Sequence, residues 1–294
     1  MSVTIIINPI SGGVRPGRAR ARAELAASVV ETDGTPAEVF VTERRGHARE
    51  LARAAVARGT RLVIAWGGDG TLNEVASALA FQEVPLALVP AGSGNGLARE
   101  LGVDVRPARA IADAIHAQPR TIDLGQVGDR LFVNVAGFGL DACVAAQFDR
   151  PDNRRRGFAG YAAITARALA TYVPQTYTIT TPDACRVSRA VLVTLANSAQ
   201  FGNGARIAPR ALLDDGLLDL VVVEERARWR TVCNVRRLFD GTVERIPGCS
   251  ICHIREATIE SDRPLLFHVD GEPVEGGTRV QVRILPAALR VAVR

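Results

Sequence analysis

The sequence predicts an α/β protein with two domains: an N-terminal parallel sheet in a three-layer arrangement with helices, and a C-terminal domain that is mainly an antiparallel β-sandwich. Two observations predict this division. Over residues 1–125, short apolar runs alternate with helical patterns, and such repeats form parallel sheets covered by helices on both faces. Over residues 126–294, short strand-like runs separated by turn residues dominate, which is typical of antiparallel sandwiches. The last residues can return to the first domain.

The first domain is expected to alternate strands and helices along its whole length. The expected strands are 3–8, 37–41, 62–66 and 86–90, and the expected helices are 17–30, 47–58, 72–79, 97–101 and 107–117. Loops that follow parallel strands gather at one edge of the sheet, where ligands bind. We therefore expect the polar loops 8–13, 67–71 and 92–96 to lie together, with Thr42 close to them.

The second domain is expected to contain many short strands and two helices. The expected strands are 131–135, 177–181, 190–196, 217–223, 257–260, 265–269 and 280–284, and the expected helices are 157–172 and 228–240. Turn residues between such short strands favour an antiparallel arrangement.

Composition limits the function classes. Of the 294 residues, 47% are hydrophobic and 23% are charged, which is ample for a core and argues against disorder. All 36 basic residues are arginine, so mechanisms that need a P-loop, kinase-strand or Schiff-base lysine are excluded. The net charge of +5 favours anionic partners such as a nucleotide or an acidic membrane face. Aromatic residues make up only 5%, without basic stretches interleaved, so nucleic acid is not expected as a partner.

The N-terminus and the hydropathy pattern bear on localisation. No apolar run approaches the length of a membrane-spanning helix. The first residues lack a basic region and run into Asn8-Pro9, so they are interpreted as a first strand and not as a signal peptide. We therefore expect a cytoplasmic protein.

The cysteines are expected to be reduced thiols, because their number is odd and they are scattered. They are Cys143, Cys185, Cys233, Cys249 and Cys252. The run Cys249-Ser-Ile-Cys252-His253 also matches the pattern of c-type haem attachment. The segment 250–259 alternates like a strand, which favours strand thiols over haem.

One motif carries most of the chemical information. The apolar run 62–66 ends in Gly67-Gly68-Asp69-Gly70-Thr71, and a helical pattern follows at once. Glycines let a backbone approach a phosphate, and the helix start offers N–H groups and a favourable dipole. Asp69 can hold a cation or orient water, and Thr71 can cap the helix or bind a phosphate oxygen. A tight strand-to-helix turn is the alternative interpretation.

The run 67–71 resembles the nucleotide-binding signature of the diacylglycerol kinase, sphingosine kinase and NAD kinase superfamily. The run Asn8-Pro9-Ile10-Ser11-Gly12 resembles the opening motif Asn-Pro-x-Ser-Gly of the lipid kinases, which typical NAD kinases lack. The run 90–96 resembles the family's Pro-x-Gly-Thr-x-Asn-Asp loop, but Ser93 replaces the threonine and Gly96 replaces the final aspartate. The resemblance implies that ATP is bound by Asn8, Ser11, Gly12, Thr42, Gly67, Gly68, Asp69, Gly70, Thr71, Asn73, Glu74, Gly92 and Ser93.

A further motif lies in the second domain, where Phe201-Gly-Asn-Gly leads into Leu212-Leu-Asp-Asp215-Gly-Leu217. By itself this run is also consistent with a hairpin around Asp-Gly. It resembles the bacterial lipid-kinase motif in which an aspartate binds a structural Mg²⁺ together with backbone carbonyls, a ligand set that hard cations accept. The resemblance implies that Asp215 supplies the carboxylate and that Leu212 and Leu217 supply carbonyls.

The third motif, Asp270-Gly271-Glu272, follows the strand 265–269. A solvated Asp-Gly turn is the alternative. The motif resembles the family's Asp-Gly-Glu, which faces the nucleotide and takes the proton of the substrate hydroxyl, so the catalytic base is either Asp270 or Glu272. Asp123 and the run 134–141 also resemble the family and are interpreted as hinges. The basic cluster of Arg150 and 154–156 can meet anionic lipid, a dimer partner or only solvent.

The resemblance implies an ATP-dependent lipid kinase that uses Mg²⁺ and phosphorylates diacylglycerol or a related glycerolipid. It also implies a lipid substrate at the membrane surface, peripheral contact with the inner membrane face, and the option of a homodimer. Two alternatives stay open: an NAD kinase, and a nucleotide-binding regulatory protein with impaired catalysis, which the glycine at position 96 would explain.

Overall fold

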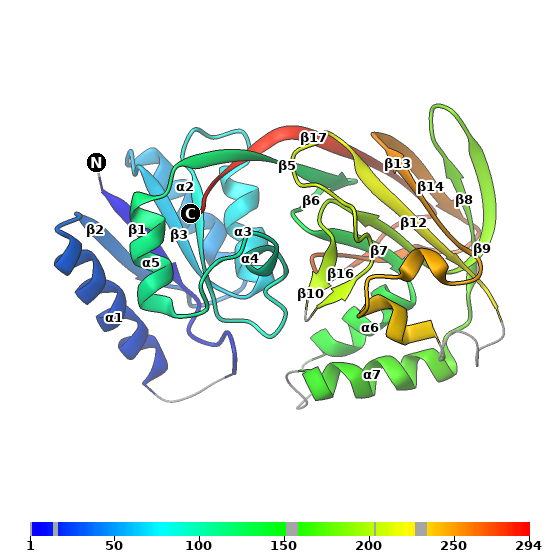
Figure 1. Ribbon diagram of the computed structural model, residues 1–294, viewed down its shortest axis with the longest axis horizontal. Helices are drawn as coiled ribbons and strands as arrows, with labels where there is room; N and C mark the ends of the chain where they lie inside the picture. The colour runs from blue at the N-terminus through cyan, green and yellow to red at the C-terminus, as the bar shows by residue number, and fades with distance from the viewer. Residues whose placement is uncertain (1, 14–16, 151–157, 203, 227–233) are drawn as a thin grey trace. The chain divides into compact units, whose positions relative to one another are not determined.

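The computed structural model describes residues 2–13, 17–150, 158–202, 204–226 and 234–294 (Figure 1). The chain divides into two compact units. Unit 1 contains the residues up to Ile122 together with Ala287–Arg294, and unit 2 contains Asp123–Pro286. The C-terminal residues therefore return to the first unit, where they add a strand to its sheet.

Unit 1 has the predicted three-layer arrangement around a parallel sheet. Its strands follow the order β2 (Ala37–Val41), β1 (Val3–Ile7), β3 (Leu62–Gly67), β4 (Leu86–Pro90) and the end of β17 (Arg279–Ala292). The helices α1 (Arg18–Asp33) and α5 (Pro107–His116) cover one face, α2 (His47–Ala57) and α3 (Asp69–Leu79) cover the other, and α4 (Gly96–Glu100) follows β4 (Figure 1). Every residue of β1 is buried, as expected for a strand covered on both faces.

Unit 2 is built from antiparallel strands that enclose an apolar core. Its main strand path is β16 (Glu272–Glu275), β15 (Leu266–Val269), β7 (Val135–Gly139), β9 (Cys185–Ala196), β8 (Gln175–Thr180), β14 (Glu256–Ser261) and β17. The strand β12 (Leu218–Glu224) joins β9 to β13 (Cys249–Ile254), while β5 (Pro119–Val127) pairs with β17 and with β6 (Arg130–Phe132).

The remaining elements of unit 2 are short or helical. They are the pair β10 (Gln200–Gly202) and β11 (Ala205–Arg206), the helices α6 (Leu140–Asp149) and α7 (Phe158–Thr171), and the 3-10 turns η1 (Val235–Leu238) and η2 (Val243–Arg245). Helix α6 packs against β7, β15 and β16. No helix in the described parts of the chain is long and apolar enough to cross a membrane.

Several details differ from the sequence-based expectation, among them the strands β5 and β16, which lie outside every expected strand. Helix α3 begins at Asp69 and not at residue 72, because an acidic residue is favoured in a first helical turn. The expected strand 131–135 is two strands, β6 and β7, with a bend at residues 133–134. No expected helix covers the residues of α6. The expected helix 228–240 lies partly outside the described residues, and its described end forms only η1.

The cysteine motif lies on a strand, in agreement with the interpretation as strand thiols. Cys249 and Cys252 are three residues apart on β13, opposite Val223 and Leu220 of β12. Because successive side chains of a strand point to opposite faces, the two thiols face opposite sides of the sheet. This arrangement does not suit the attachment of one haem.

Candidate active site

Three loops follow β1, β3 and β4 in unit 1: the first loop (8–13), the second loop (67–71) and the third loop (92–96). The second and third loops cross with their backbones in contact. A Cβ built on Gly92 would lie 2.7 Å from Cα of Gly68, so this crossing requires glycine. The N–H of Ala91 donates to the carbonyl of Gly67 at 2.8 Å and holds the crossing together.

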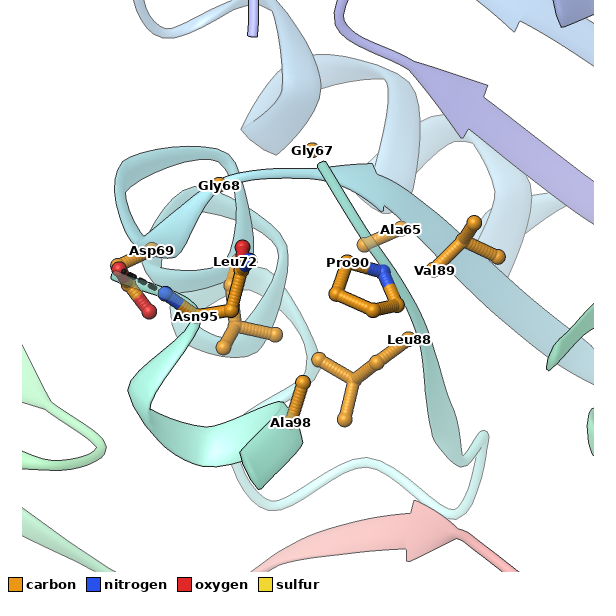
Figure 2. A pocket seen from close by; sticks show the side chains of 10 residues that line it. All are labelled: Ala65, Gly67, Gly68, Asp69, Leu72, Leu88, Val89, Pro90, Asn95 and Ala98. Carbon is orange, nitrogen blue, oxygen red and sulfur yellow. Dashed lines mark hydrogen bonds between the residues drawn. The ribbon is translucent and has the colours of Figure 1, made fainter. Parts of the chain in front are cut away.

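Asp69 anchors the third loop. One carboxylate oxygen accepts the backbone N–H of Asn95 at 2.9 Å (Figure 2), and the other accepts that of Gly96 at 2.8 Å. The side chain of Asn95 in turn accepts the N–H of Gly92 at 2.8 Å and donates to its carbonyl at 2.9 Å. The carboxylate therefore lies at the start of α4, which a negative charge stabilises. Its role toward a cation or a water molecule stays a prediction.

The start of α3 is the place where the sequence predicts an anion site. Helix α3 has Gly68 as its N-cap, and glycine has no side chain that could cap the first turn. The N–H groups of Gly70 and Thr71 belong to this turn, which is where helices bind phosphate. The hydroxyl of Thr71 accepts a hydrogen bond from the amide of Asn8 at 2.8 Å, so its own proton can be donated to a phosphate oxygen.

The first loop touches both of the others, which confirms the expectation that the three loops lie together. Asn8 reaches Thr71 of the second loop, as described above. Gly12 has a φ of 74°, and a Cβ on it would lie 2.7 Å from the carbonyl oxygen of Ala91, which leads into the third loop. The hydroxyl of Ser11 donates to the carbonyl of Asn8 at 3.0 Å.

Two arginines of α1 hold the first loop, and sequence reasoning missed both. Arg22 donates to the carbonyl of Asn8 at 2.5 Å and to the carbonyl and hydroxyl of Ser11, both at 3.0 Å. Its guanidinium lies 5.5 Å from the ring centroid of Trp66. Arg18 donates to the carbonyl of Gly13 at 2.6 Å and to that of Ser11 at 2.9 Å. Burial, and secondarily the charge of Arg18, lower the pKa of Arg22.

The other residues predicted for ATP binding have varied surroundings. Thr42 is buried, and its N–H donates to the carbonyl of Ile7 at 2.8 Å. Asn73 is buried and accepts a hydrogen bond from Ser77. The carboxylate of Glu74 accepts the N–H groups of Gly46 at 2.7 Å and Ala48 at 3.1 Å, at the start of α2. Glu74 thus stabilises the start of a neighbouring helix, whereas Ser93 is exposed in the third loop.

A small pocket lies beneath the crossing loops (Figure 2). Its walls are the ends of β3 and β4 with Leu72 and Ala98. The space open to the centre of a water molecule is only about 10 Å³, which holds about one water molecule. Gly67, Gly68 and Asp69 of the second loop and Asn95 of the third loop also line this pocket.

In unit 2, the turn 270–272 is the end of a hairpin formed by β15 and β16. Asp270 and Gly271 have φ values of 47° and 86°, the left-handed pair typical of a two-residue hairpin turn. The carboxylate of Asp270 accepts three backbone N–H groups: Val133 at 2.8 Å, Asn134 at 2.8 Å and Val135 at 3.2 Å. Asp270 is therefore an anchor between the hairpin and the bend before β7, and not a solvated turn residue.

The loop predicted to bind Mg²⁺ has a defined shape. The carboxylate of Asp215 accepts the N–H of Leu217 at 3.0 Å. The buried Asp123, interpreted from the sequence as a hinge residue, accepts the N–H of Gly216 at 2.7 Å and donates its own N–H to the carbonyl of Leu213, also at 2.7 Å. The described residues contain no group of three or more His, Cys, Asp or Glu that could hold a metal ion. A cation here would thus depend on fewer than three such side chains and on backbone carbonyls.

Only one residue of the basic cluster of Arg150 and 154–156 lies in the described part of the chain. Arg150 is exposed at the end of α6, and residues 154–156 lie outside the described part of the chain.

Comparison with known families assigns the two halves of the chain. Residues 2–127 match the family described as the diacylglycerol kinase catalytic domain, and residues 134–293 match the YegS C-terminal NAD kinase beta sandwich-like domain. The chain therefore belongs to the diacylglycerol kinase family. It is a kinase, and ATP use follows from membership of this family.

Curated relatives agree with this assignment over most of their length. A protein of Chromohalobacter salexigens named "Probable lipid kinase YegS-like" is 32% identical over 91% of this chain and 87% of its own. A protein of the same name from Pseudomonas aeruginosa is 32% identical over 95% of this chain and 91% of its own.

Solved structures support the fold. The crystal structure of a diacylglycerol kinase from Bacillus anthracis matches with a TM-score of 0.73 and 20% identity, over 100% of this chain and 97% of that one. A second structure from this organism matches with a TM-score of 0.82 and 22% identity, over 100% and 95%.

Proposed function

We propose that the protein transfers the γ-phosphate of ATP to the hydroxyl of diacylglycerol or of a related glycerolipid. The observation that carries the proposal is the glycine-capped start of α3 at the crossing of two glycine loops, in a chain whose relatives are named lipid kinases. Phosphoryl transfer needs positioning and charge neutralisation more than covalent chemistry, and this site offers donors for that purpose.

The phosphate-binding part of the proposal rests on unit 1. First-turn N–H groups of α3 and the hydroxyl of Thr71 would donate to phosphate oxygens. Arg18 and Arg22 would keep the first loop in place through its carbonyls, and their charges would attract the nucleotide without direct contact. This arrangement fits a chain that has no lysine.

The geometry of the turn 270–272 favours Glu272 over Asp270 as the base. The oxygens of Asp270 accept three backbone N–H groups, and protonating this carboxylate would weaken all three bonds. Glu272, which directly follows Gly271 and begins β16, is only partly buried. In the proposed step the hydroxyl oxygen bonds to the γ-phosphorus, the bond from phosphorus to the β–γ bridging oxygen breaks, and the hydroxyl proton moves to Glu272.

Mg²⁺ is proposed as the divalent cation of the reaction and of the loop 212–217. When bound, it would screen the phosphate charges and would cross-link this loop. The loop fits a hard cation in part, because Asp215 and the carbonyls of Leu212 and Leu217 belong to one short turn whose shape Asp123 fixes.

The acceptor lipid resides in a membrane, so we propose peripheral contact with a membrane surface. The net charge of +5 supports attraction to anionic lipid.

The proposal is tested with the purified full chain, γ-labelled ATP and Mg²⁺. The acceptors are vesicles that contain diacylglycerol, phosphatidylglycerol, sphingosine or ceramide, with NAD as a soluble acceptor. Label in the organic phase, abolished by a chelator and restored by Mg²⁺, is the expected result, with diacylglycerol as the best acceptor. Label in NAD alone, or ATP binding without transfer to any acceptor, would refute the proposal.

A further inference from the structure

The turn 270–272 has a second support besides the carboxylate of Asp270. His268 of β15 is only 4% exposed, and its Nδ1 lies 3.2 Å from the backbone nitrogen of Gly271. Because a backbone N–H only donates, Nδ1 must be the acceptor in this bond. The proton of the neutral ring is therefore on Nε2.

Asp141 receives the hydrogen bond from that side of the ring. Its Oδ2 lies 3.3 Å from Nε2 of His268, and the side chain of Asp141 is 9% exposed. Its Oδ1 accepts the N–H of Ala142 at 2.8 Å in the first turn of α6, and the hydroxyl of Thr194 on β9 lies 3.3 Å from its Oδ2. A carboxylate held in this way fixes both the tautomer and the orientation of an imidazole.

The strand between these side chains is adapted to them. Gly137 of β7 is directly opposite His268 in the register of β7 and β15. A Cβ at this position would lie 1.9 Å from Oδ2 of Asp141 and 2.8 Å from Nε2 of His268. Glycine weakens the middle of a strand and often marks a close approach. Any other residue at position 137 would place its Cβ in the space that the side chains of Asp141 and His268 occupy.

We infer that His268, oriented by Asp141, is a positioning residue for phosphoryl transfer. It holds the N–H of Gly271 and thereby fixes the direction in which the chain leaves the turn toward Glu272. The inference rests on the proposed function, since it takes Glu272 as the base. Asp270 fixes the start of the turn, and His268 fixes the residue directly before the base. A displacement of a reacting group by about 1 Å can cost about 100-fold in rate.

Substitution of His268 by Asn or Gln tests its contact with Gly271 and its contact with Asp141 separately. The Asn amide reaches about as far as Nδ1, so His268→Asn keeps an acceptor near Gly271 and loses the contact with Asp141. The Gln amide reaches about as far as Nε2, so His268→Gln keeps the contact with Asp141 and removes the acceptor of the Gly271 N–H. The matched control is His253→Gln, which changes an exposed histidine of the same unit.

We expect His268→Gln to lower kcat about 10- to 100-fold, with the KM for ATP changed less than about 3-fold, and His268→Asn to lose clearly less. The control is expected to match the wild type. A merely structural histidine would lower the melting temperature in both variants without this split in kcat. Equal kcat values for the two variants, whether high or low, would overturn the inference.

Nitrogen NMR of the histidine rings provides a readout that needs no substrate. The wild type is expected to show His268 with the proton on Nε2, and hydrogen exchange at the Gly271 amide is expected to be slow. In Asp141→Asn, the new amide can donate toward Nε2, so the ring proton should move to Nδ1 and exchange at Gly271 should become faster. A proton on Nδ1 in the wild type would overturn the inference, even if one of the His268 variants fails to fold.

These measurements also distinguish a failure of the proposed lipid kinase function from a failure of the positioning role of His268. A wild type that phosphorylates no lipid refutes the proposed function, while the NMR experiment still tests the support of the turn. A wild type that phosphorylates lipid, together with unchanged kcat in His268→Gln, refutes only the positioning role.

Discussion

Two aspartates, one in each unit, hold neighbouring backbone in the same way but over different distances along the chain. Asp69 in unit 1 accepts the N–H groups of Asn95 and Gly96, 26 and 27 residues later. Asp270 in unit 2 accepts three N–H groups that lie 135 to 137 residues earlier. The first carboxylate joins two loops of consecutive βα repeats, whereas the second closes unit 2 near the end of the chain. Loss of the same charge should therefore have different consequences in the two units.

The largest effect is expected from Glu272→Gln, which removes the proposed base without touching either anchor. We expect kcat to fall about 10²- to 10⁴-fold, the usual contribution of a general base, in a variant that still folds. The measurement is label transfer to diacylglycerol alongside a thermal melt. The control is Glu275→Gln, at the exposed end of the same strand. Activity above half of the wild type would show that Glu272 is not the base. The assignment of Asp270 as an anchor and Glu272 as the base would then be wrong.

Asp270→Asn is the next largest, and it should affect both folding and turnover. The amide keeps one acceptor oxygen and turns a donor toward backbone N–H groups, so bonds worth about 1.5–3 kcal/mol each to a charged acceptor are lost. We expect unit 2 to lose about 3 kcal/mol of unfolding free energy, together with activity. Urea unfolding monitored by hydrogen exchange of β7 and β15 measures this loss. An inactive variant of full stability would instead make Asp270 a catalytic group.

Asp69→Asn sharpens the comparison, because it removes an anchor of only two N–H groups in a partly exposed loop. The expected loss is about 1–2 kcal/mol, confined to the third loop and α4. The KM for ATP should rise, since the loop beside the anion site becomes less ordered. Hydrogen exchange of α4 against α1 measures whether the loss is local. Destabilisation of all of unit 1, equal to that of unit 2 in Asp270→Asn, would contradict the difference drawn between the two anchors.

The distances along the chain also explain what could be predicted from the sequence. In unit 1, the strand-to-loop-to-helix signals are local, and a parallel sheet must bring the carboxyl ends of its strands together. The meeting of the three loops followed from this rule, whereas the close approach of Gly68 and Gly92 was not predicted. The hydrogen bonds of Arg22 to the first loop were not predicted, because the direction of a long side chain on α1 depends on tertiary packing. The spacing of Arg18 and Arg22, four residues apart just after the loop, was the available signal.

In unit 2, the motifs were visible but their partners were not. Asp270 was recognised as a candidate catalytic residue, yet its anchoring of residues 133–135 depends on pairing between β15 and β7. Pairing over such separations leaves no local pattern. The same holds for the contact of His268 with Asp141, 127 residues apart. Gly137 was the one local sign, since a glycine inside a strand indicates a close approach.

A smaller effect is expected from Arg22→Ala. Arg22 holds the first loop by donating hydrogen bonds, whereas Asp69 and Asp270 hold their loops by accepting them. The first loop would lose three hydrogen bonds and become less ordered, while the chemistry would be untouched. We expect the KM for ATP to rise about 5- to 10-fold with kcat within about 2-fold. The control is Arg20→Ala on the same helix, where the arginine pairs only with the exposed Glu24. A fall in kcat with unchanged KM would place Arg22 closer to the reaction than its contacts indicate.

The smallest effect concerns the pH dependence of a pair that lies far from both anchors in the sequence. Asp33, the last residue of α1, accepts a hydrogen bond from Thr35 and lies 2.6 Å from Nε2 of His116 at the end of α5. The bond from Thr35, and next the one from His116, lower the pKa of Asp33 below its usual value of 3.8. The folded state therefore binds this proton more weakly than the unfolded chain does. The ionised group stabilises unit 1 above about pH 4, and this stabilisation is lost as the pH falls through the lowered pKa.

Asp33→Asn should therefore cost a little stability at pH 5 and less at pH 3, and the difference stays small because the pair is exposed to solvent. Hydrogen exchange of α1 and α5 at the two pH values measures it, with β7 and β15 of unit 2 as the internal reference. Because the contact joins only the ends of two helices that already pack together, the reference strands should not respond. A parallel response in unit 2 would mean that the two units unfold as one. In that case, the local anchor at Asp69 and the distant anchor at Asp270 would be equivalent in stability, and their difference would concern only the order in which the chain folds.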